Sequence, residues 1–367
     1  MTEADEIQVE QFYPLCPVQQ GMLYHCIGHP DSGMYVNQVC GALSGRLDTG
    51  ALDRAWQAVI DRHAILRTAF VWEDVDEPVQ VVCGGVALQL QIEDWRERSE
   101  QDQGRALESF LIHDRMKGFD LASPPLMRFS LIRLGETTWR LVWSHHHLIL
   151  DGWSVGLVLN ELFAFYEAFA GGQSLTLEKP RPYSDYIDWL SNRDGSHAKL
   201  FWIERLNGFR APTSLGMTGN GRNKPAKGGD YGVQQTSLSA SVTDRVTSSA
   251  RKAGLTLNTI VQGVWALIIS RYSGDRDVVY GTTFSGRSAS LEGIERIVGL
   301  FINTLPVRVR VSLEQPTLAM LLRLQDDLIR IQEFESTPLV EVQKWSEVPR
   351  RAPLFESILG FENLPGS

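Results

Sequence analysis

An alternation of apolar and polar residues in the segment WRLVWSHHH predicts a β-strand over residues 139–147. Side chains alternate between the two faces of a strand, so His147 is expected on one face and His146 on the other. A turn at Asp151 and Gly152 follows. Apolar residues then recur at helical spacing, which predicts a helix over 154–170 with Ser154 as its N-cap. This strand, turn and helix form the centre of the predicted fold.

The same two periodicities predict strands and helices in both halves of the chain. Pro17 is expected to open a short helix, and the other predicted elements of the first half are strands 35–43, 69–72, 78–82, 88–92 and 126–134 and helices 49–66 and 103–116. The second half is predicted to contain helices 241–253, 256–272 and 317–332 and strands 277–284 and 298–311. The recurring order predicts an α/β protein with two similar lobes.

A proline-containing segment, LEKPRPYSDY, reads as the linker between these lobes. We therefore expect an N-terminal domain at 1–178 and a C-terminal domain at 179–367. Residues 215–232 are rich in Gly, Asn and Lys and are predicted to form a mobile loop.

Composition narrows the functional classes. The 367 residues include 35 basic and 44 acidic ones, for a net charge of -9, which argues against nucleic acid as the main partner. The longest apolar run is short, at residues 264–269, and the acidic N-terminus has no apolar signal region, so we expect a cytoplasmic protein that does not span a membrane. The cysteines show no CxxC pair and are predicted to be reduced core thiols.

The strand end at His147 is the candidate catalytic site. A histidine fixed by a strand, with a carboxylate four residues later on a sharp turn, suits proton transfer near neutral pH. The catalytic candidates are His147, His146, Asp151 and Gly152. The alternative for His147 is a buried structural histidine. We interpret Asp151 as scaffold paired with Arg62, which together with Ser154 would support the site, although Arg62 could equally be a solvated charge at a helix end.

Two other chemistries fit parts of this segment less well. Three consecutive histidines suggest a metal, but only two share a face and no HExxH or cysteine partner lies nearby, so no metal is expected. Residues 152–156 spell GxSxG between a strand and a helix, as in a hydrolase nucleophile elbow. The required downstream histidine could only be His197, which lies in a polar segment with little chain between it and the elbow.

These residues resemble the condensation domains of nonribosomal peptide synthetases, within the chloramphenicol-acetyltransferase-like superfamily. HHLILDG at 146–152 matches the HHxxxDG signature of the family. CPVQQGMLY, RHAILRTAF, YSDYIDW, VGLFINTLPVR and RRAPLFESILGF resemble further family blocks, in the family's order and over the whole chain. Ala64 departs from the Glu common in the second block, and residues 335–343 match the sixth only loosely.

The resemblance implies an α/β fold of the α+β sandwich type, with two acetyltransferase-like lobes forming a V-shaped pseudo-dimer. The chain ends just after its last motif, which implies a second lobe that is incomplete at its C-terminus. His147 would lie where two tunnels meet, and the candidates for tunnel lining are Tyr166, Trp202, Ser285 and Asn303. By residue type Tyr166 and Trp202 are expected in the core, with a place in a channel as the alternative.

The implied activity is that of an acyltransferase. The amine of a carrier-bound aminoacyl group would attack a donor acyl or peptidyl thioester and form an amide, in antibiotic or lipopeptide biosynthesis. No cofactor is expected on the chain itself, since phosphopantetheine arms of carrier proteins, or acyl-CoA, would present the substrates. Donor and acceptor carrier proteins and an adjacent adenylation domain are the expected partners, and the chain is expected to be a monomer.

Two alternatives stay open at this point. A starter condensation domain would N-acylate the first amino acid from acyl-CoA, and the style of the first and third blocks fits such domains as well as those that accept a D-configured donor. A non-catalytic condensation-like module would only recruit partner enzymes, but such a module would be expected to lose the second histidine, and His147 is present.

Overall fold

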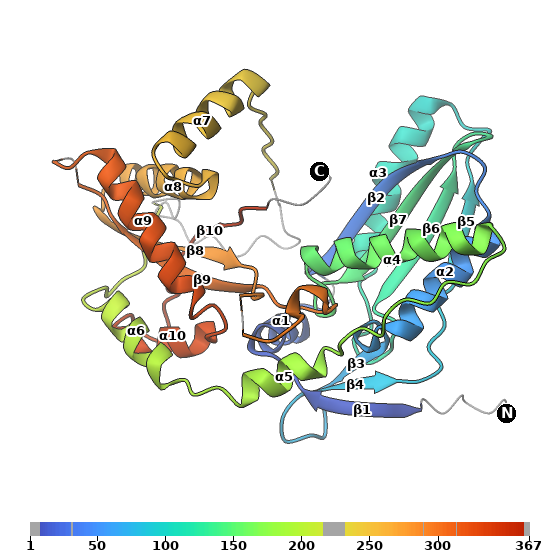
Figure 1. The fold of residues 1–367 in the computed structure, drawn as a ribbon, viewed down its shortest axis with the longest axis horizontal. Helices are drawn as coiled ribbons and strands as arrows, with labels where there is room; N and C mark the ends of the chain where they lie inside the picture. The colour runs from blue at the N-terminus through green and yellow to red at the C-terminus, as the bar shows by residue number, and fades with distance from the viewer. Residues whose placement is uncertain (1–7, 31, 216–231, 289, 313, 363–367) are drawn as a thin grey trace. The chain divides into compact units, whose positions relative to one another are not determined.

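The computed structural model describes residues 8–30, 32–215, 232–288, 290–312 and 314–362, in two compact units (Figure 1). The first unit holds the described residues of Met1–Asn192 and Leu291–Leu300, and the second those of Arg193–Ser290 and Phe301–Asn363. Both units contain helices and strands, which confirms the mixed α/β class, although the elements do not alternate strictly, since consecutive strands occur in the first unit and consecutive helices in the second. The predicted mobile loop at 215–232 lies outside the described residues except at its two ends.

The division between the units falls at 192/193, whereas the sequence placed it at 178/179. The segment beyond the prolines stays with the first unit because its aromatic side chains are buried there. Tyr183 is 2% exposed and its hydroxyl donates a 2.6 Å hydrogen bond to the carbonyl of Leu300, while Tyr186 is 4% exposed. The residues after the prolines therefore still pack in the first unit, and the prolines do not mark its boundary.

The main sheet of the first unit has the strand order β2-β7-β6-β5. The strands are β2 (Val36–Ser44), β5 (Leu90–Asp94), β6 (Met127–Arg133) and β7 (Thr138–His146). Neighbouring strands are antiparallel except β5 and β6, which are parallel. Helices α2 (Thr49–Arg62) and α4 (Gly152–Ala170) pack side by side (Figure 1).

Contacts of β7 confirm the predicted alternation of its side chains. Trp143 lies 5.3 Å from Trp56 of α2, measured between ring centroids. Val142 packs instead into a cluster with Phe110 of α3 (Glu100–Met116). The strand therefore has α2 on one face and α3 on the other, and consecutive histidines at its end enter different surroundings.

A second, smaller sheet of the first unit has the order β1-β4-β3. Its strands are β1 (Val9–Pro14), β3 (Thr68–Val71) and β4 (Val79–Cys83). Helix α1 (Pro17–Gly28) starts at the predicted proline, and α5 (Ser184–Ser191) follows the linker. Helix α2 ends before its predicted limit because residues Ala64–Arg67 tighten into a 3-10 turn.

The second unit is built on a sheet with the order β10-β8-β9. Strand β8 (Asp277–Phe284) pairs antiparallel with β9 (Asn303–Arg310) and parallel with the short β10 (Ile358–Leu359). The helices are α6 (Ser196–Leu206), α7 (Ala240–Lys252), α8 (Leu257–Ser273), α9 (Thr317–Gln332) and α10 (Leu339–Trp345). The predicted strand over 298–311 begins only at Asn303, since residues up to Leu300 belong to the first unit.

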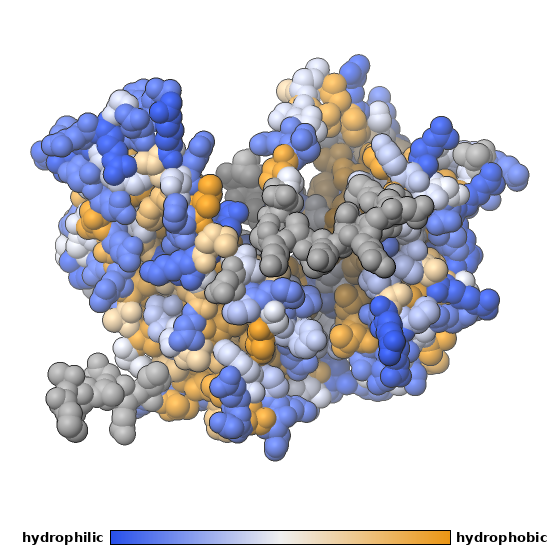
Figure 2. Space-filling view, turned by 180° about the vertical axis from the view of Figure 1, so that it is seen from behind, coloured by the Kyte–Doolittle hydropathy of each residue, from blue (hydrophilic) through white to orange (hydrophobic). Residues whose placement is uncertain are grey.

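Two surface features complete the description. Hydrophilic and hydrophobic residues are interspersed over the face drawn in Figure 2. Within the described residues no single helix is long and apolar enough to cross a membrane, and α7 and α8 meet that test only as a pair bent by 101°.

All four cysteines are free, but the prediction that they are core thiols is wrong for Cys40, which is exposed on the edge strand β2.

Candidate active site

His147 follows β7 directly and is held by two backbone groups. Its amide N–H donates to the carbonyl of Tyr35 over 2.7 Å. Its ring Nδ1 lies 2.6 Å from the carbonyl oxygen of Leu150. These contacts fix both the main chain and the ring, while the residue stays half-buried.

The contact with Leu150 decides the tautomer of the neutral His147 ring. A carbonyl oxygen can accept but not donate, so Nδ1 must carry the proton. The lone pair of the neutral imidazole is then on Nε2, for which no hydrogen bond is seen within the described chain. His147 is therefore oriented as a base with a free accepting nitrogen.

His146 has the opposite tautomer and no free nitrogen. The amide N–H of Leu148 donates to its Nδ1 over 3.2 Å, so the neutral ring carries its proton on Nε2, which lies 3.6 Å from the Cys26 sulfur. Phe119 and Tyr35 pack against the ring. The side chain is 3% exposed, so this histidine of the signature supports the strand end from inside the fold.

Burial also keeps His145 and His146 neutral. His145 is 1% exposed, and neither of its ring nitrogens has a hydrogen-bond partner among the described residues. Burial, with a smaller contribution from the neighbouring charge of His147, lowers the pKa of both side chains to about 3. Both side chains are therefore neutral when the protein is near neutral pH.

These lowered pKa values predict a loss of stability in acid. Between the ordinary histidine pKa of 6.5 and about 3, the unfolded chain binds protons that the folded chain excludes, so the free energy of unfolding falls as pH falls. Each histidine contributes a slope of up to about 1.4 kcal/mol per pH unit. We expect His145→Leu to make the decline between roughly pH 6 and pH 5 shallower by about that amount. Urea denaturation at several pH values measures this, and an unchanged slope would contradict it.

Asp151 and Ser154 join the start of α4 to the segment Leu291–Leu300. Asp151, 1% exposed, is the N-cap, because its Oδ1 accepts a 2.8 Å hydrogen bond from the Ser154 amide. The prediction that Ser154 caps the helix is therefore wrong, and the helix starts at Gly152, which is exposed. The Ser154 hydroxyl donates to the Gly299 carbonyl over 2.7 Å and lies 3.0 Å from the Gly299 amide.

Ser154 does not have the geometry of a hydrolase nucleophile. Its hydroxyl is fully buried and bonded to main chain, and the residue lies inside the first turn of α4. A nucleophile elbow instead exposes the serine on a strained turn before the helix. No group of three or more His, Cys, Asp or Glu side chains in the described ranges is placed to hold a metal ion.

The predicted pairing of Arg62 with Asp151 is wrong. Arg62 Nε donates to Glu161 Oε2 over 2.9 Å, and its other nitrogens reach the carbonyls of Leu177 and Glu178. Arg62 is the last residue of α2, whose partner helix α4 passes it well beyond its first turn. Ten residues of helix separate Asp151 from Glu161, about 15 Å along the axis, so Arg62 meets the nearer carboxylate.

Glu161 is the partner of Arg62 that the sequence did not reveal. Its Oε2 also lies 2.7 Å from Nε2 of the buried His63. Burial opposes ionisation of the carboxyl, but the hydrogen bonds and charges of His63 and Arg62 outweigh it and hold the pKa of Glu161 below its usual range. The partners are separated by 98 and 99 residues, and nothing in the local pattern of either helix links them.

We expect Glu161→Gln to destabilise the chain by about 1–3 kcal/mol, because it removes the negative charge that pairs with Arg62 and replaces a carboxylate oxygen shared by Arg62 and His63 with a weaker, neutral acceptor or a competing N–H donor. The measurement is the urea midpoint near neutral pH. Glu167→Gln, an exposed substitution of the same kind on the same helix, is the control and should leave the midpoint unchanged. Equal urea midpoints for both variants would show that the contacts of Glu161 with Arg62 and His63 do not stabilise the chain.

Tyr35 was also missed by sequence reasoning. It has φ 60°, in the left-handed region that few non-glycine residues adopt, and its carbonyl receives the His147 amide. Its hydroxyl lies 2.8 Å from Nδ1 of His25. The backbone at the candidate base is thus held by a residue in a costly conformation, a common feature of functional sites.

The four candidates for tunnel lining have different surroundings. Trp202 is 0% exposed in the core of the second unit, so its assignment to a channel is wrong. Asn303 is buried and its side-chain amide donates to the carbonyls of Glu335 and Thr337, which makes it a structural tie and corrects its assignment as well. The Tyr166 hydroxyl accepts from the Asp48 amide at the start of α2, and its tunnel role stays a prediction.

Ser285 does line a cavity, within the second unit. The cavity has a volume of about 370 Å³, and its walls include Gln262 and Thr282. These two are linked, since the Gln262 amide donates to the Thr282 hydroxyl, which in turn donates to the Leu359 carbonyl. The assignment of this cavity to a substrate stays a prediction.

Comparison with known proteins identifies the fold and the family. The chain superposes on a solved starter condensation domain of rhizomide synthetase in complex with C8-CoA, with a TM-score of 0.79, 18% identity, and coverage of 95% of this chain and 78% of that one. It superposes on the first condensation domain of the calcium-dependent antibiotic synthetase with a TM-score of 0.77, 19% identity, and coverage of 96% and 81%. The fold is therefore that of a condensation domain.

Curated relatives agree with this fold. The chain is 48% identical to one of the linear gramicidin synthase proteins of Brevibacillus parabrevis over 358 residues, 98% of this chain and 7% of that protein. It is 36% identical to bacitracin synthase 1 of Bacillus licheniformis, over 97% of this chain and 7% of that protein. For surfactin synthase subunit 3 of Bacillus subtilis (strain 168) the identity is 34%, over 100% of this chain and 28% of that protein.

The family model of the condensation domain matches residues 9–367. The chain belongs to the condensation-domain family of nonribosomal peptide synthetases, and it spans only a small part of the length of these relatives.

Proposed function

We propose that this chain forms an amide bond between two thioester-bound substrates. In this proposal His147 accepts the proton of the attacking amine. One observation carries the proposal. The Nδ1 proton of His147 is held by the Leu150 carbonyl, which leaves the lone pair of Nε2 free on a half-buried, fixed ring. An amine near such a nitrogen can lose its proton as it becomes a nucleophile.

The proposed reaction balances without any bound cofactor. The acceptor amine attacks the donor carbonyl carbon and a C–N bond forms. His147 Nε2 receives the proton that the nitrogen loses, the C–S bond breaks, and that proton passes to the departing sulfur. Leu150 supports this sequence because its carbonyl also faces the Nδ1–H of the ring when the imidazole is protonated.

The substrates are proposed to arrive on phosphopantetheine arms of donor and acceptor carrier proteins, beside an adenylation domain of a larger synthetase. The great length of the relatives supports this setting, since the chain matches 5–28% of proteins named as gramicidin, bacitracin and surfactin synthases. The starter alternative, with acyl-CoA as donor, is supported by the solved neighbours in complex with C8-CoA.

An intact-mass assay tests the proposal and separates its alternatives. An aminoacyl carrier protein is incubated with this chain and with a carrier-bound acyl donor, an acyl-CoA donor or no donor. If the mass of the aminoacyl carrier protein increases only when the carrier-bound donor is present, the chain has an elongation role. If it increases only when acyl-CoA is present, the chain has the starter role. Absence of product with both donors, from a folded chain that still binds the carrier protein, would overturn catalysis in favour of recruitment.

A further inference from the structure

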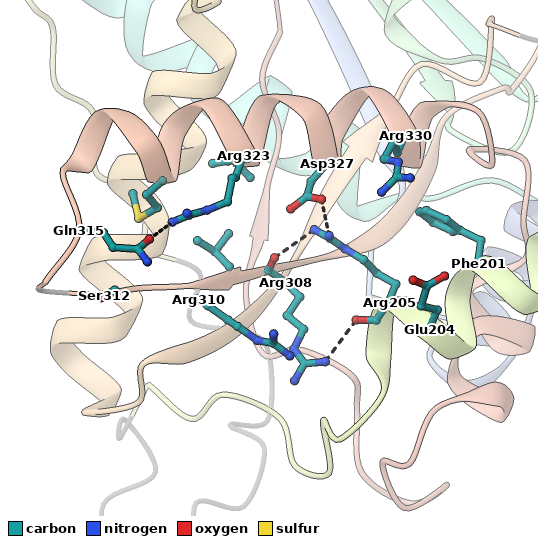
Figure 3. Close-up of a pocket in the computed structure, with 13 residues that line it drawn as sticks. Phe201, Glu204, Arg205, Arg308, Arg310, Ser312, Gln315, Arg323, Asp327 and Arg330 are labelled. Atoms are coloured by element: carbon teal, nitrogen blue, oxygen red, sulfur yellow. Dashed lines mark hydrogen bonds and ion pairs between the residues drawn. The ribbon is translucent and has the colours of Figure 1, made fainter.

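An arginine-lined groove of about 490 Å³ opens in the second unit between α6, β9 and α9 (Figure 3). Arg205 enters it from α6, Arg308 and Arg310 from β9, and Arg323 and Arg330 from α9. The volume is within the range of small-molecule sites. Nothing in the proposed amide-forming chemistry uses these residues.

The charges around this groove do not cancel. Arg205 pairs with Asp327 over 2.5 Å, and Arg308 donates to both oxygens of Asp277 over 2.8 and 2.6 Å. Asp277 also lies 3.6 Å from Arg310. With Glu204 of the groove and Asp326, which lines an adjoining pocket together with Arg323 and Arg330, four carboxylates lie near five guanidinium groups, so a small positive excess remains. This local excess stands out because the whole chain carries a net charge of -9.

Two of the five groove arginines lie on one helix, α9, and differ from the other three in their pairing. Arg323 and Arg330 are exposed and are separated by two turns of α9, about 10 Å along the axis. Among the described residues, neither makes an ion pair, and Arg323 donates only to the neutral side chain of Gln315. Asp327, between them in sequence, is already neutralised by Arg205. In Figure 3 all three extend from the side of α9 that faces β9.

Protection of a sheet edge explains part of this cluster but not these two arginines. Strand β9 is an edge of the described sheet, and Arg205 covers it by donating to the Arg308 carbonyl over 3.1 Å. Cationic side chains at such an edge discourage pairing with another strand. Because Arg205 occupies that carbonyl, an extended peptide is a poor fit for the groove.

We propose that the groove binds a small anion that carries two or more phosphoryl groups. The forked guanidinium group matches phosphate oxygens in pairs, and two such groups two turns apart require at least two anionic centres. The fixed pairs of Arg205 and Arg308 form the floor of the site. Phe201, Met320 and Leu324 add apolar surface for the uncharged part of the ligand.

Isothermal titration calorimetry with inorganic pyrophosphate and inorganic tripolyphosphate, at constant ionic strength, tests this site on the whole chain. We expect saturable binding at one site, weakened about tenfold by Arg323→Gln or Arg330→Gln and further in the double variant. Arg271→Gln, an exposed substitution on α8 outside the groove, is the matched control and should bind like the native chain.

Three results would overturn the proposal. These are the absence of saturable binding, equal weakening by the Arg271 control, and a glutamate-rich peptide that displaces tripolyphosphate and binds more tightly. Circular dichroism of each variant verifies folding, which the exposed positions should leave intact. Because the readout is binding and not amide formation, this test is independent of the proposed catalytic role of His147.

Discussion

Replacement of His147 with alanine is expected to lower the single-turnover rate of amide formation by about a hundredfold to ten-thousandfold, the usual contribution of a positioned acid or base. The physical reason is the loss of the free Nε2, the nitrogen that accepts the proton of the attacking amine. His145 and His146 cannot replace it, because both are buried and their pKa values lie near 3. Intact mass of the acceptor carrier protein over time gives the rate.

His113→Ala is the matched control for this experiment. His113 is an exposed histidine on α3 whose ring contacts only Ser109 of the same helix among the described residues. Its loss should leave the rate unchanged. A rate within a few-fold of native for His147→Ala, in a variant with native unfolding behaviour, would show that His147 does not transfer the proton.

Replacement of Gly299 with alanine is expected to destabilise the first unit by about 3 kcal/mol. An added Cβ would lie 2.2 Å from the ring of Tyr183, far inside contact distance. That ring cannot move away easily, since it is 2% exposed and its hydroxyl is bonded to the Leu300 carbonyl. A shift of Gly299 instead would disturb its two hydrogen bonds with Ser154 at the start of α4.

Gly156→Ala is the control. It is also a glycine-to-alanine substitution, but it is expected to raise the free energy of unfolding and not to lower it. Gly156 is exposed within α4, and an added Cβ there meets no atom within 4 Å. Alanine in a helix interior is favoured over glycine by about 0.5–1 kcal/mol, so this variant should be slightly more stable. Urea denaturation of both variants gives the comparison. A native midpoint for Gly299→Ala would show that the Tyr183 contact is loose.

The elements around the site could be predicted because they obey local rules. The alternation over residues 139–147 predicted different faces for neighbouring side chains, and the contacts of Val142 and Trp143 confirm it within β7. The strand ends at His146, so His147 itself lies in the turn that follows. The helical spacing of Leu52, Trp56 and Val59 predicted the buried face of α2. The period of a helix or a strand follows from its local backbone geometry, so the residues of one element are enough to predict which of its faces is buried.

The partners of charged side chains could not be predicted in the same way. Arg62 was assigned to Asp151, but the arrangement of α2 along α4 brings it to Glu161. The cap of α4 was assigned to Ser154 because serine is a common N-cap, yet Asp151 offers the same acceptor three residues earlier and Ser154 bonds to Gly299. Both errors arise because the sequence pattern does not give the register between distant segments.

Aromatic and polar residues of the second unit show the same limit. Trp202 and Asn303 suited a channel by residue type, but one lies in the core and the other ties β9 to residues Glu335 and Thr337. Large aromatic and amide side chains occur in cores and in binding sites alike, so residue type alone does not separate the two.

The tautomer of His147 is the most direct test of this account. Nitrogen-15 NMR of the imidazole side chains, near pH 7 in the native chain, distinguishes the protonated from the unprotonated ring nitrogen. The geometry predicts that the neutral ring of His147 carries its proton on Nδ1 and has an unprotonated Nε2. A neutral His147 ring with its proton on Nε2 would leave no free base at the site and would contradict the proposed mechanism.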